Sequence, residues 1–340
     1  MDTLYTSRLH GFPNLSKAGL EPALNEESLL SLLVVLGSSI SLVALVFAFI
    51  TYSLFSDLRN LSGTTLMNLL AALFMSQLLY VVGVGGVPDS ELCIALAFAL
   101  QYARLCIFCW MLLMTHNMHH QFKTGLHLVP ITDNHIGRHF LRYSLFGWGM
   151  PLILFGASLL IQYHDKAGKL LNTATIKGQN CWFLDRNAFI YGLLAPSAIL
   201  IVATFYYLVC SAVLARYIIS IQADIRTREK MRRKRTLQIL LFSKITIALS
   251  VVLALGAFSK LSNRSEPFWI MYNVAQGMQG FLVALLVTCN CQVLKLYTRS
   301  IKSRASRHVP CYVGTGQTSS SMNKSTSLQL LTWDPAPDSV

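Results

Sequence analysis

The stretch LQYARLCIFCWMLLMTHNMHHQF, residues 100–122, decides the fold. It is the second half of an apolar segment that runs from Leu92 to Met114, followed by His116, His119 and His120. About 20 apolar residues cross the roughly 30 Å hydrocarbon core of a membrane as a helix, so this segment is long enough to span it. The histidines have the spacing i, i+3 and i+4, which places them on one helical face. They form either a metal site or the polar end of a membrane helix.

Composition and the rest of the chain favour the membrane. The 340 residues are 54% hydrophobic and 13% charged, with a mean hydropathy of +0.50, whereas soluble domains carry about a quarter charged residues. Seven segments are apolar and long enough to span: Leu29–Tyr52, Thr64–Val87, Leu92–Met114, Ser144–Tyr163, Ala188–Leu214, Leu237–Phe258 and Phe268–Thr288. We therefore expect an all-α membrane protein, a bundle of seven transmembrane helices in one domain, 28–296. A short N-terminus, 1–27, precedes this domain, and a polar Ser/Thr-rich tail, 297–340, follows it and is expected to be disordered.

The distribution of charge predicts the orientation. With the N-terminus outside, the cytosolic segments hold 18 Lys and Arg residues and the outer segments hold eight. The positive-inside rule then places the N-terminus outside and the C-terminus in the cytosol. For the same reason the net charge of +13 is no sign of nucleic-acid binding. Residues 1–27 contain no apolar core of a signal peptide and leave no room for a folded extracellular domain, unless the chain is incomplete.

Cysteines and sequons follow the same division between the two sides. Of the eight cysteines, only Cys93 and Cys181 face the oxidising side, so we expect them to pair; the alternative is two free thiols. Asn14 and Asn263 begin N-glycosylation sequons on the outer side. Within the spans three cysteines are expected to be packing residues: Cys106, Cys109 and Cys210.

The histidines do not make a convincing metal centre. A catalytic zinc needs three protein ligands and an open position, and a hydrolase also needs a general base near the metal. No predicted span contains Asp or Glu, and no HExxH spacing occurs. No nucleophile elbow or phosphate-binding loop appears either, so we predict that the protein is not an enzyme and binds no metal or other cofactor. A polar helix end is the favoured interpretation, and a metal-dependent membrane hydrolase is the alternative.

Polar residues inside the spans are the candidates for ligand binding, because such residues are costly in a membrane. Arg104 lies near the middle of the third span with no acidic partner in any span. It is either a pocket cation for an anionic or carbonyl-bearing ligand or an interhelical clamp. Its possible partners are Gln77, Gln101, Asn273, Gln276 and Gln279. The predicted ligand pocket consists of Gln101, Arg104, Trp182 and Gln279. The stretch QGMQG, residues 276–280, would serve close helix packing or a movable segment.

A basic segment and the tail offer cytosolic contacts. RTREKMRRKR, residues 226–235, contains seven Lys or Arg residues and is predicted as the loop between the fifth and sixth spans. Its positive charge would help to determine the orientation of the chain in the membrane. In addition, it would bind anionic membrane lipids or a cytosolic protein partner. The terminal DSV, residues 338–340, is a weak signal for a PDZ-type partner, which captures C-terminal carboxylates in a sheet-edge groove.

Several segments, in order, resemble family B G-protein-coupled receptors, the secretin/adhesion class, and most of all the Methuselah-like receptors. They are LRNLSGTTLMNLLAALFMSQLLYVVG (58–83), the third span from Cys93 to Met114, GWGMP (147–151), CW (181–182), Pro196 and Gln279–Gly280. The resemblance covers about residues 30–300 and implies the family's disulfide for Cys93 and Cys181. Two positions depart from the secretin and adhesion pattern. Met114 stands where they usually have Glu, as in the Methuselah-like pattern, and Leu253 stands where an activation Trp is usual.

The resemblance implies a plasma-membrane receptor that passes the signal of an extracellular ligand to a heterotrimeric G protein. Outward movement of the inner ends of the fifth and sixth helices would open a cytosolic cleft. The residues expected to couple are His116, His119, His120, Arg226, Arg228, Arg232, Arg233 and Arg235. The alternatives are the metal-dependent hydrolase and a receptor-like scaffold that does not couple. A transporter would need an internal repeat, and the sequence shows none.

Overall fold

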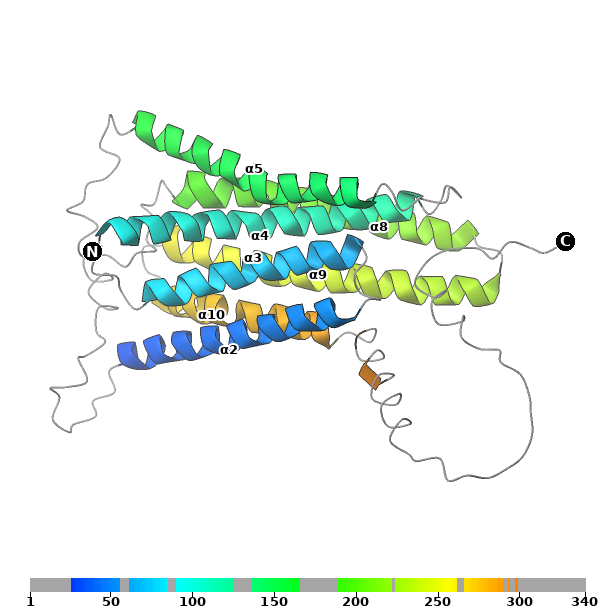
Figure 1. The fold of residues 1–340 in the computed structure, drawn as a ribbon, viewed down its shortest axis with the longest axis horizontal. Coiled ribbons are helices and arrows are strands. Elements are labelled where there is room, and N and C mark those ends of the chain that lie inside the picture. Colours follow the sequence, from blue (N-terminus) through cyan, green and yellow to red (C-terminus); the bar gives the residue numbers. More distant parts are fainter. Residues whose placement is uncertain are drawn as a thin grey trace, which may run out of the picture.

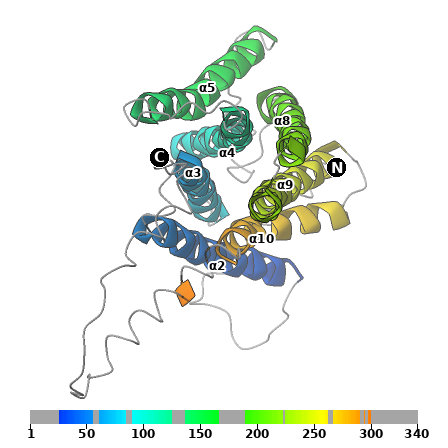
Figure 2. The ribbon, with the colours of Figure 1, turned by 90° about the vertical axis from the view of Figure 1, so that its right-hand side faces the viewer.

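The computed structural model describes residues 26–55, 61–84, 90–124, 136–165, 189–221, 224–261, 266–289, 293 and 297–298. Within these residues the chain forms long helices that lie side by side as one bundle (Figures 1 and 2). Their bounds are α2 Glu26–Leu54, α3 Leu61–Val84, α4 Ser90–Thr124, α5 Ile136–Asp165, α8 Ala195–Ile221, α9 Ile225–Leu261 and α10 Glu266–Thr288. A π-helical turn, η3 Ile190–Leu194, leads directly into α8. Each of the seven predicted spans falls on one of these helices, the fifth on η3 and α8 together, so the predicted fold class is confirmed in its all-helical architecture.

Six of the described helices are long and apolar enough to cross a membrane by length and composition. Helix α5 is not among these six. The outward faces of the helices carry many large apolar side chains, among them Val43, Leu145 and Ile199, each about 70% exposed or more. A soluble protein rarely leaves so much apolar surface uncovered, whereas lipid covers it in a membrane.

Helix α4 lies at the centre of the core and packs against α3, α5 and α8. Trp110, Met111, Met114 and Met118 on this helix are fully buried. Cys106 and Cys109 are buried and free, as the prediction of packing residues requires. Met114 therefore fills core volume.

Helix α5 lies at the edge of the bundle (Figure 2), and Trp148 is one of the residues that attach it. The Trp148 indole N–H donates to Asn68 Oδ1 on α3 at 3.2 Å, and the Tyr102 hydroxyl of α4 donates to the Trp148 carbonyl at 2.9 Å. The Trp148 and Trp110 rings meet edge to face at 5.9 Å. Gly147 permits this approach, because a Cβ atom there would overlap the Trp110 ring.

Helix α10 is joined to α2 and α3 by buried hydrogen bonds. Gln77 Nε2 on α3 donates to the carbonyl oxygens of Gln276 and Gly277, at 2.9 and 2.6 Å. The Tyr80 hydroxyl donates to Asn273 Oδ1 at 2.7 Å. Glutamine and tyrosine side chains are favourable interhelical donors in a membrane, where water is absent. The interhelical clamp is thus Gln77, a residue considered above only as a partner of Arg104.

One prediction about the connections is wrong. Residues 226–235 were expected to form the loop between the fifth and sixth spans, but they are the first turns of α9. Only 222–224 separate α8 from α9. The side chain of Asp224 explains the early start, because it accepts hydrogen bonds from the N–H groups of Arg226 and Thr227, at 3.2 and 3.1 Å, and from the Thr227 hydroxyl. An aspartate in this N-cap position satisfies the free donors of a helix's first turn.

Several predicted features lie outside the described residues. They are the N-terminal segment 1–25, Asn14, Cys181, Trp182, Asn263 and the tail beyond residue 298. Cys93 lies in α4, but its side chain is not among the described ones. The Cys93–Cys181 disulfide, both glycosylation sites and the C-terminal DSV therefore remain predictions.

Candidate functional site

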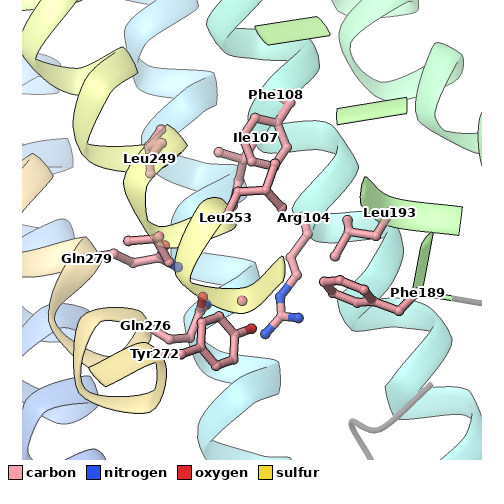
Figure 3. A pocket seen from close by; sticks show the side chains of 12 residues that line it. Arg104, Ile107, Phe108, Phe189, Leu193, Leu249, Leu253, Tyr272, Gln276 and Gln279 are labelled. Carbon is pink, nitrogen blue, oxygen red and sulfur yellow. The ribbon is translucent and has the colours of Figure 1, made fainter. Parts of the chain in front are cut away.

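A cavity lies between α4, η3, α9 and α10, in the half of the bundle where α4 and α10 begin (Figure 3). Its polar lining consists of Arg104, Tyr272, Gln276 and Gln279. Apolar residues complete the wall: Ile107, Phe108, Phe189, Leu193, Leu249, Val252 and Leu253, with Gly256. The cavity offers about 30 Å³ to the centres of water-sized groups, and its empty volume of about 410 Å³ includes open solvent. This is room for a few small groups, since one water needs about 10–15 Å³ of such space.

Two local features of the backbone shape this cavity. Phe189 and Leu193 come from the π-helical turn η3, in which the Ala195 N–H donates to the Ile190 carbonyl. Pro196 follows at once, and a proline cannot donate the next helical bond, so a widened turn at this place is reasonable. On the opposite wall Gly256 lets the Tyr272 ring lie against α9, because a Cβ atom at 256 would be only 2.9 Å from Tyr272 Cε2.

Arg104 points into the cavity, and Figure 3 shows its guanidinium and the Tyr272 hydroxyl turned toward one another. Its buried Nε has no hydrogen-bond partner, and no ion pair joins Arg104 to any other part of the chain that the structure describes. Of the partners that the sequence offered, Gln77 and Asn273 bond elsewhere. The guanidinium thus lines the cavity, and its role as a pocket cation or as an interhelical clamp stays a prediction.

The predicted pocket residues are only partly brought together. Arg104 and Gln279 line the cavity. Gln101 lies about one turn from Arg104 on α4 and is 2% exposed, but it is not part of the lining. Trp182 is outside the described residues. The sequence reasoning missed Tyr272 and Gly256, and the only signal for them was their place near the ends of predicted spans.

The histidines lie at the other end of the bundle, which we call the α8–α9 end because it holds the connection between these helices. His116 is partly buried between two tyrosines: its Nδ1 lies 3.2 Å from the Tyr143 hydroxyl of α5, and its ring meets Tyr207 of α8 edge to face at 5.1 Å. His119 also contacts the Tyr207 ring, whereas His120 is exposed beside His139. Within the described ranges no three His, Cys, Asp or Glu side chains are grouped so that they could hold a metal ion. His116 therefore joins three helices and is more than a polar helix end.

The basic first turns of α9 project beyond the ends of α2, α3 and α10, at the right of Figure 1. Arg226, Arg228, Arg232 and Arg233 are exposed there. Arg235 differs, because its guanidinium carbon lies 5.1 Å from the centre of the Phe122 ring of α4. Phe122 is 5% exposed, and Nη1 of Arg235 is buried without a hydrogen-bond partner in the described part. This cation–π contact connects the beginning of α9 with the end of α4.

Sequence reasoning also missed Ser41, Phe122, Tyr143 and Tyr207, which make the contacts that join helices. Ser41 donates to the Gly277 carbonyl at 2.6 Å and accepts from the Phe281 N–H at 3.0 Å. A serine inside an apolar span was the available signal, since small polar residues gather at membrane helix interfaces. Nothing in the sequence marked the two tyrosines, because aromatic residues are common at membrane boundaries.

Comparisons with known proteins agree with this architecture. The family model described as 7 transmembrane receptor (Secretin family) matches residues 27–283. The human adhesion G protein-coupled receptor E3 is 26% identical over 282 residues, which cover 81% of this chain and 40% of that protein. The human adhesion G-protein coupled receptor G4 is 27% identical over 263 residues, or 76% of this chain and 8% of that protein. The adhesion G protein-coupled receptor L4 of Danio rerio is 28% identical over 169 residues, or 49% of this chain and 21% of that protein.

The chain thus spans less than half the length of these curated relatives. The family match covers the described helices α2 to α9 and most of α10, which includes every residue of the cavity. The relatives are receptors, so the prediction that this protein is not an enzyme is confirmed, and it is a multi-pass membrane protein. The chain belongs to the seven-transmembrane receptors of the secretin family.

Proposed function

We propose that this protein is a G-protein-coupled receptor that transmits the signal of an extracellular ligand to a heterotrimeric G protein. The N-terminus is outside the plasma membrane and the α8–α9 end is in the cytosol. The excess of Lys and Arg at that end supports this orientation by the positive-inside rule. The names of the relatives, adhesion G protein-coupled receptors, support the coupling.

One observation carries the proposal: the contact between Arg235 and Phe122 at the α8–α9 end. Arg235 holds the first turns of α9 against the end of α4, 5.1 Å from the ring centre to the guanidinium carbon. A cation–π contact contributes about 0.5–2 kcal/mol, depending on how far it is removed from water. An energy of this size suits a switch, because a two-state equilibrium responds to a few kcal/mol.

Release of this contact would free the long first part of α9. The helix has 37 residues and is about 55 Å long at about 1.5 Å per residue, well beyond the thickness of a membrane core. If α9 and α8 move outward, a cleft opens at the end of α4 beside Phe122. A helix or loop of the G protein would enter this cleft.

Each predicted coupling residue has a place in this mechanism. Arg226, Arg228, Arg232 and Arg233 offer exposed positive charge for the G protein or for anionic lipids. His116 and His119 pack on Tyr207 and steady the position of α8 relative to α4. His120 is exposed at the rim of the cleft. The extracellular ligand would bind at the opposite half of the bundle, in the cavity beside Arg104 and Gln279.

Finer assignments belong to the same proposal. Met114 supports a place among the Methuselah-like receptors, since it fills the core where the secretin and adhesion pattern has a carboxylate. A Cys93–Cys181 disulfide, glycans on Asn14 and Asn263, and a PDZ-type partner at the C-terminus complete the proposed receptor.

The test is G protein activation in cells without added ligand. The full chain is expressed with a panel of energy-transfer sensors, one for each G protein class. The variant with Arg232 and Arg233 both changed to Ala is the comparison, at matched surface level. A basal signal that this double variant lowers establishes coupling and names the G protein class. A panel without signal for the wild-type chain and for the Arg235→Ala variant, both at the surface, contradicts coupling and favours a scaffold.

A further inference from the structure

The cavity beside Arg104 contains buried N–H donors that have no acceptor. Arg104 Nε and Gln276 Nε2 both lack a hydrogen-bond partner in the described part of the chain. Gln276 is 3% exposed and lines the cavity, and its own backbone carbonyl is already taken by Gln77. About one turn from Arg104, Gln101 Nε2 is a third buried donor in the same condition. Donors are thus in excess on this side of the bundle.

An excess of buried donors is costly unless something supplies acceptors. Leaving a donor unpaired costs more than an ordinary hydrogen bond contributes, and a charged donor costs most. No predicted span contains Asp or Glu, so none of them offers a carboxylate to the Arg104 cation. A bound molecule with acceptor oxygens would satisfy these donors, and the cation among them favours a molecule that carries negative charge.

Shape and surroundings narrow the class of anion. The guanidinium group has a planar fork of N–H donors, which matches the two oxygens of a carboxylate better than a spherical ion. Ile107, Phe189 and Leu193 line the same cavity with apolar surface, which an inorganic ion would leave uncovered. The cavity has about 30 Å³ for the centres of water-sized groups, enough for a carboxylate head but not for a folded peptide segment.

We propose that this cavity binds a small organic monocarboxylate. Its carboxylate accepts hydrogen bonds from Arg104 and Gln276, with the Tyr272 hydroxyl beside it, and its short apolar body contacts Phe189 and Leu193. The inference deepens the proposed receptor function by naming the chemical class of its ligand. Binding itself, however, does not depend on coupling to a G protein.

The experiment measures thermal unfolding of the purified full-length chain in detergent, with butyrate and benzoate as the probes. A ligand that binds only the folded state raises the midpoint temperature with concentration. We expect both acids to raise it in a saturable way, while 1-butanol, benzyl alcohol and added chloride do not. An equal rise of the midpoint temperature with the neutral alcohols would show that the cavity binds molecules by their apolar shape alone. An equal shift with chloride would show an unselective anion site. Either result overturns the proposal.

Variants assign the effect to this site. Arg104→Gln removes the cation but keeps a polar chain, and we expect the affinity for benzoate to fall about tenfold or more, as for loss of a charged hydrogen bond. Lys244→Gln is the matched control, because it removes a cation from α9 at an exposed position that does not line the cavity. Retained binding in Arg104→Gln, or equal loss in Lys244→Gln, contradicts the proposal.

A second variant covers the possibility that Arg104→Gln folds poorly. Gln276→Glu places a carboxylate in the cavity itself, so that Arg104 gains an internal partner. We expect this variant to be at least as stable as the wild type and to have lost its response to benzoate. A Gln276→Glu chain that still responds to benzoate overturns the proposal.

The two proposals fail separately. A chain that binds benzoate but activates no G protein keeps the carboxylate site and contradicts coupling. A chain that activates a G protein but whose unfolding ignores both acids keeps coupling and contradicts the carboxylate site.

Discussion

Ser41 and Gly277 are joined by a 2.6 Å hydrogen bond in which the Ser41 hydroxyl donates to the Gly277 carbonyl. The same hydroxyl accepts from the Phe281 N–H at 3.0 Å. Gly277 and Phe281 are four residues apart, the two ends of one helical hydrogen-bond step in α10. A side chain inserted at such a step is a known cause of helix bending. The serine of α2 therefore holds α10 within QGMQG, residues 276–280, where the glycines would permit the helix to bend.

The first prediction concerns Ser41 itself. Ser41→Ala removes both hydrogen bonds to α10 and should lower the free energy of unfolding by about 1–3 kcal/mol, the range for leaving buried partners unpaired. Ser39→Ala is the matched control, since Ser39 is exposed and bonds only the Val35 carbonyl of its own helix. Thermal unfolding in detergent makes the comparison. Equal midpoints for the two variants would contradict the role given to Ser41.

The second prediction concerns the close approach of α2 and α10. A Cβ atom at Gly280 would lie 2.8 Å from Leu45 Cδ1 and 3.0 Å from Ser41 Cβ, and the latter cannot move without α2. Gly280→Ala should therefore destabilise the protein by about 1–3 kcal/mol through overpacking. Gly156→Ala on α5 meets nothing within 4 Å and should be neutral or stabilising, because alanine favours a helix. Unfolding midpoints that rank the two variants in the opposite order would refute this packing.

The third prediction separates the arginines at the beginning of α9. Arg235→Ala breaks the contact with Phe122 and should raise basal G protein activation up to several-fold, because the closed arrangement loses about 0.5–2 kcal/mol. Arg232 and Arg233 are exposed, so changing both to Ala removes charge without loosening the helix and should lower activation. Energy-transfer sensors measure both. Phe122→Ala is the independent check, since it must act like Arg235→Ala if the ring contact is the cause.

The fourth prediction tests the histidines as structural residues. His116→Phe keeps a ring against Tyr207 but loses the contact of Nδ1 with Tyr143, and should lower the free energy of unfolding by about 0.5–1.5 kcal/mol. His120→Ala, at an exposed position, should change little. The purified wild-type chain should contain no stoichiometric zinc by elemental analysis. One zinc per chain that disappears when His116, His119 and His120 are replaced would restore the hydrolase alternative.

The fifth prediction concerns pH at the beginning of α9. Hydrogen bonds from the Thr227 hydroxyl and from the N–H groups of Thr227 and Arg226 lower the pKa of Asp224 below its usual value. A carboxyl whose pKa is lowered by folding stabilises the helix above its unfolded pKa, and this stabilisation is lost as the pH falls through the lowered value. The protection of the Arg226 and Thr227 amides, measured as the exchange rate relative to the intrinsic rate at the same pH, should therefore be high at neutral pH and fall only in acid. Asp224→Ala should remove this protection at neutral pH, whereas Glu229→Ala, an exposed change one turn on, should not.

Much of the fold could be predicted from the sequence because a membrane helix is recognisable by its length and composition. Each of the seven predicted spans lies on one helix, the fifth with its π-helical turn. Some helices extend well beyond the predicted ends: α4 ends at Thr124 instead of Met114, and α9 begins at Ile225 instead of Leu237. The basic segment 226–235 was predicted as a loop because charge ends an apolar span, but charge does not end a helix. The Asp224 cap and a run of good helix formers continue α9 into the polar region.

The candidate site was only half visible in the sequence. Arg104 stood out because an ionisable residue inside a membrane span is rare, and Gln279 because it lies in QGMQG. Tyr272, Gly256 and the residues of η3 did not, because nothing local distinguishes them from other span residues. Gln77 was only one of five possible partners of Arg104 in the sequence, because many buried amides compete and only distance decides among them.

The sequence by itself determined that the chain is a bundle of membrane helices. The composition and length of a segment decide whether it enters the membrane, and there its backbone groups must pair within a helix. Only the tertiary structure decided which polar side chains meet. In the folded chain, Gln77 and Ser41 form hydrogen bonds with the backbone of α10. His116 packs between Tyr143 and Tyr207. Arg104 and Gln276 line one cavity, and each has a buried N–H donor without an acceptor. Hydrogen bonds and ring contacts act over a few ångströms, and residues as far apart in the chain as Ser41 and Gly277 come within that range only when the helices have packed.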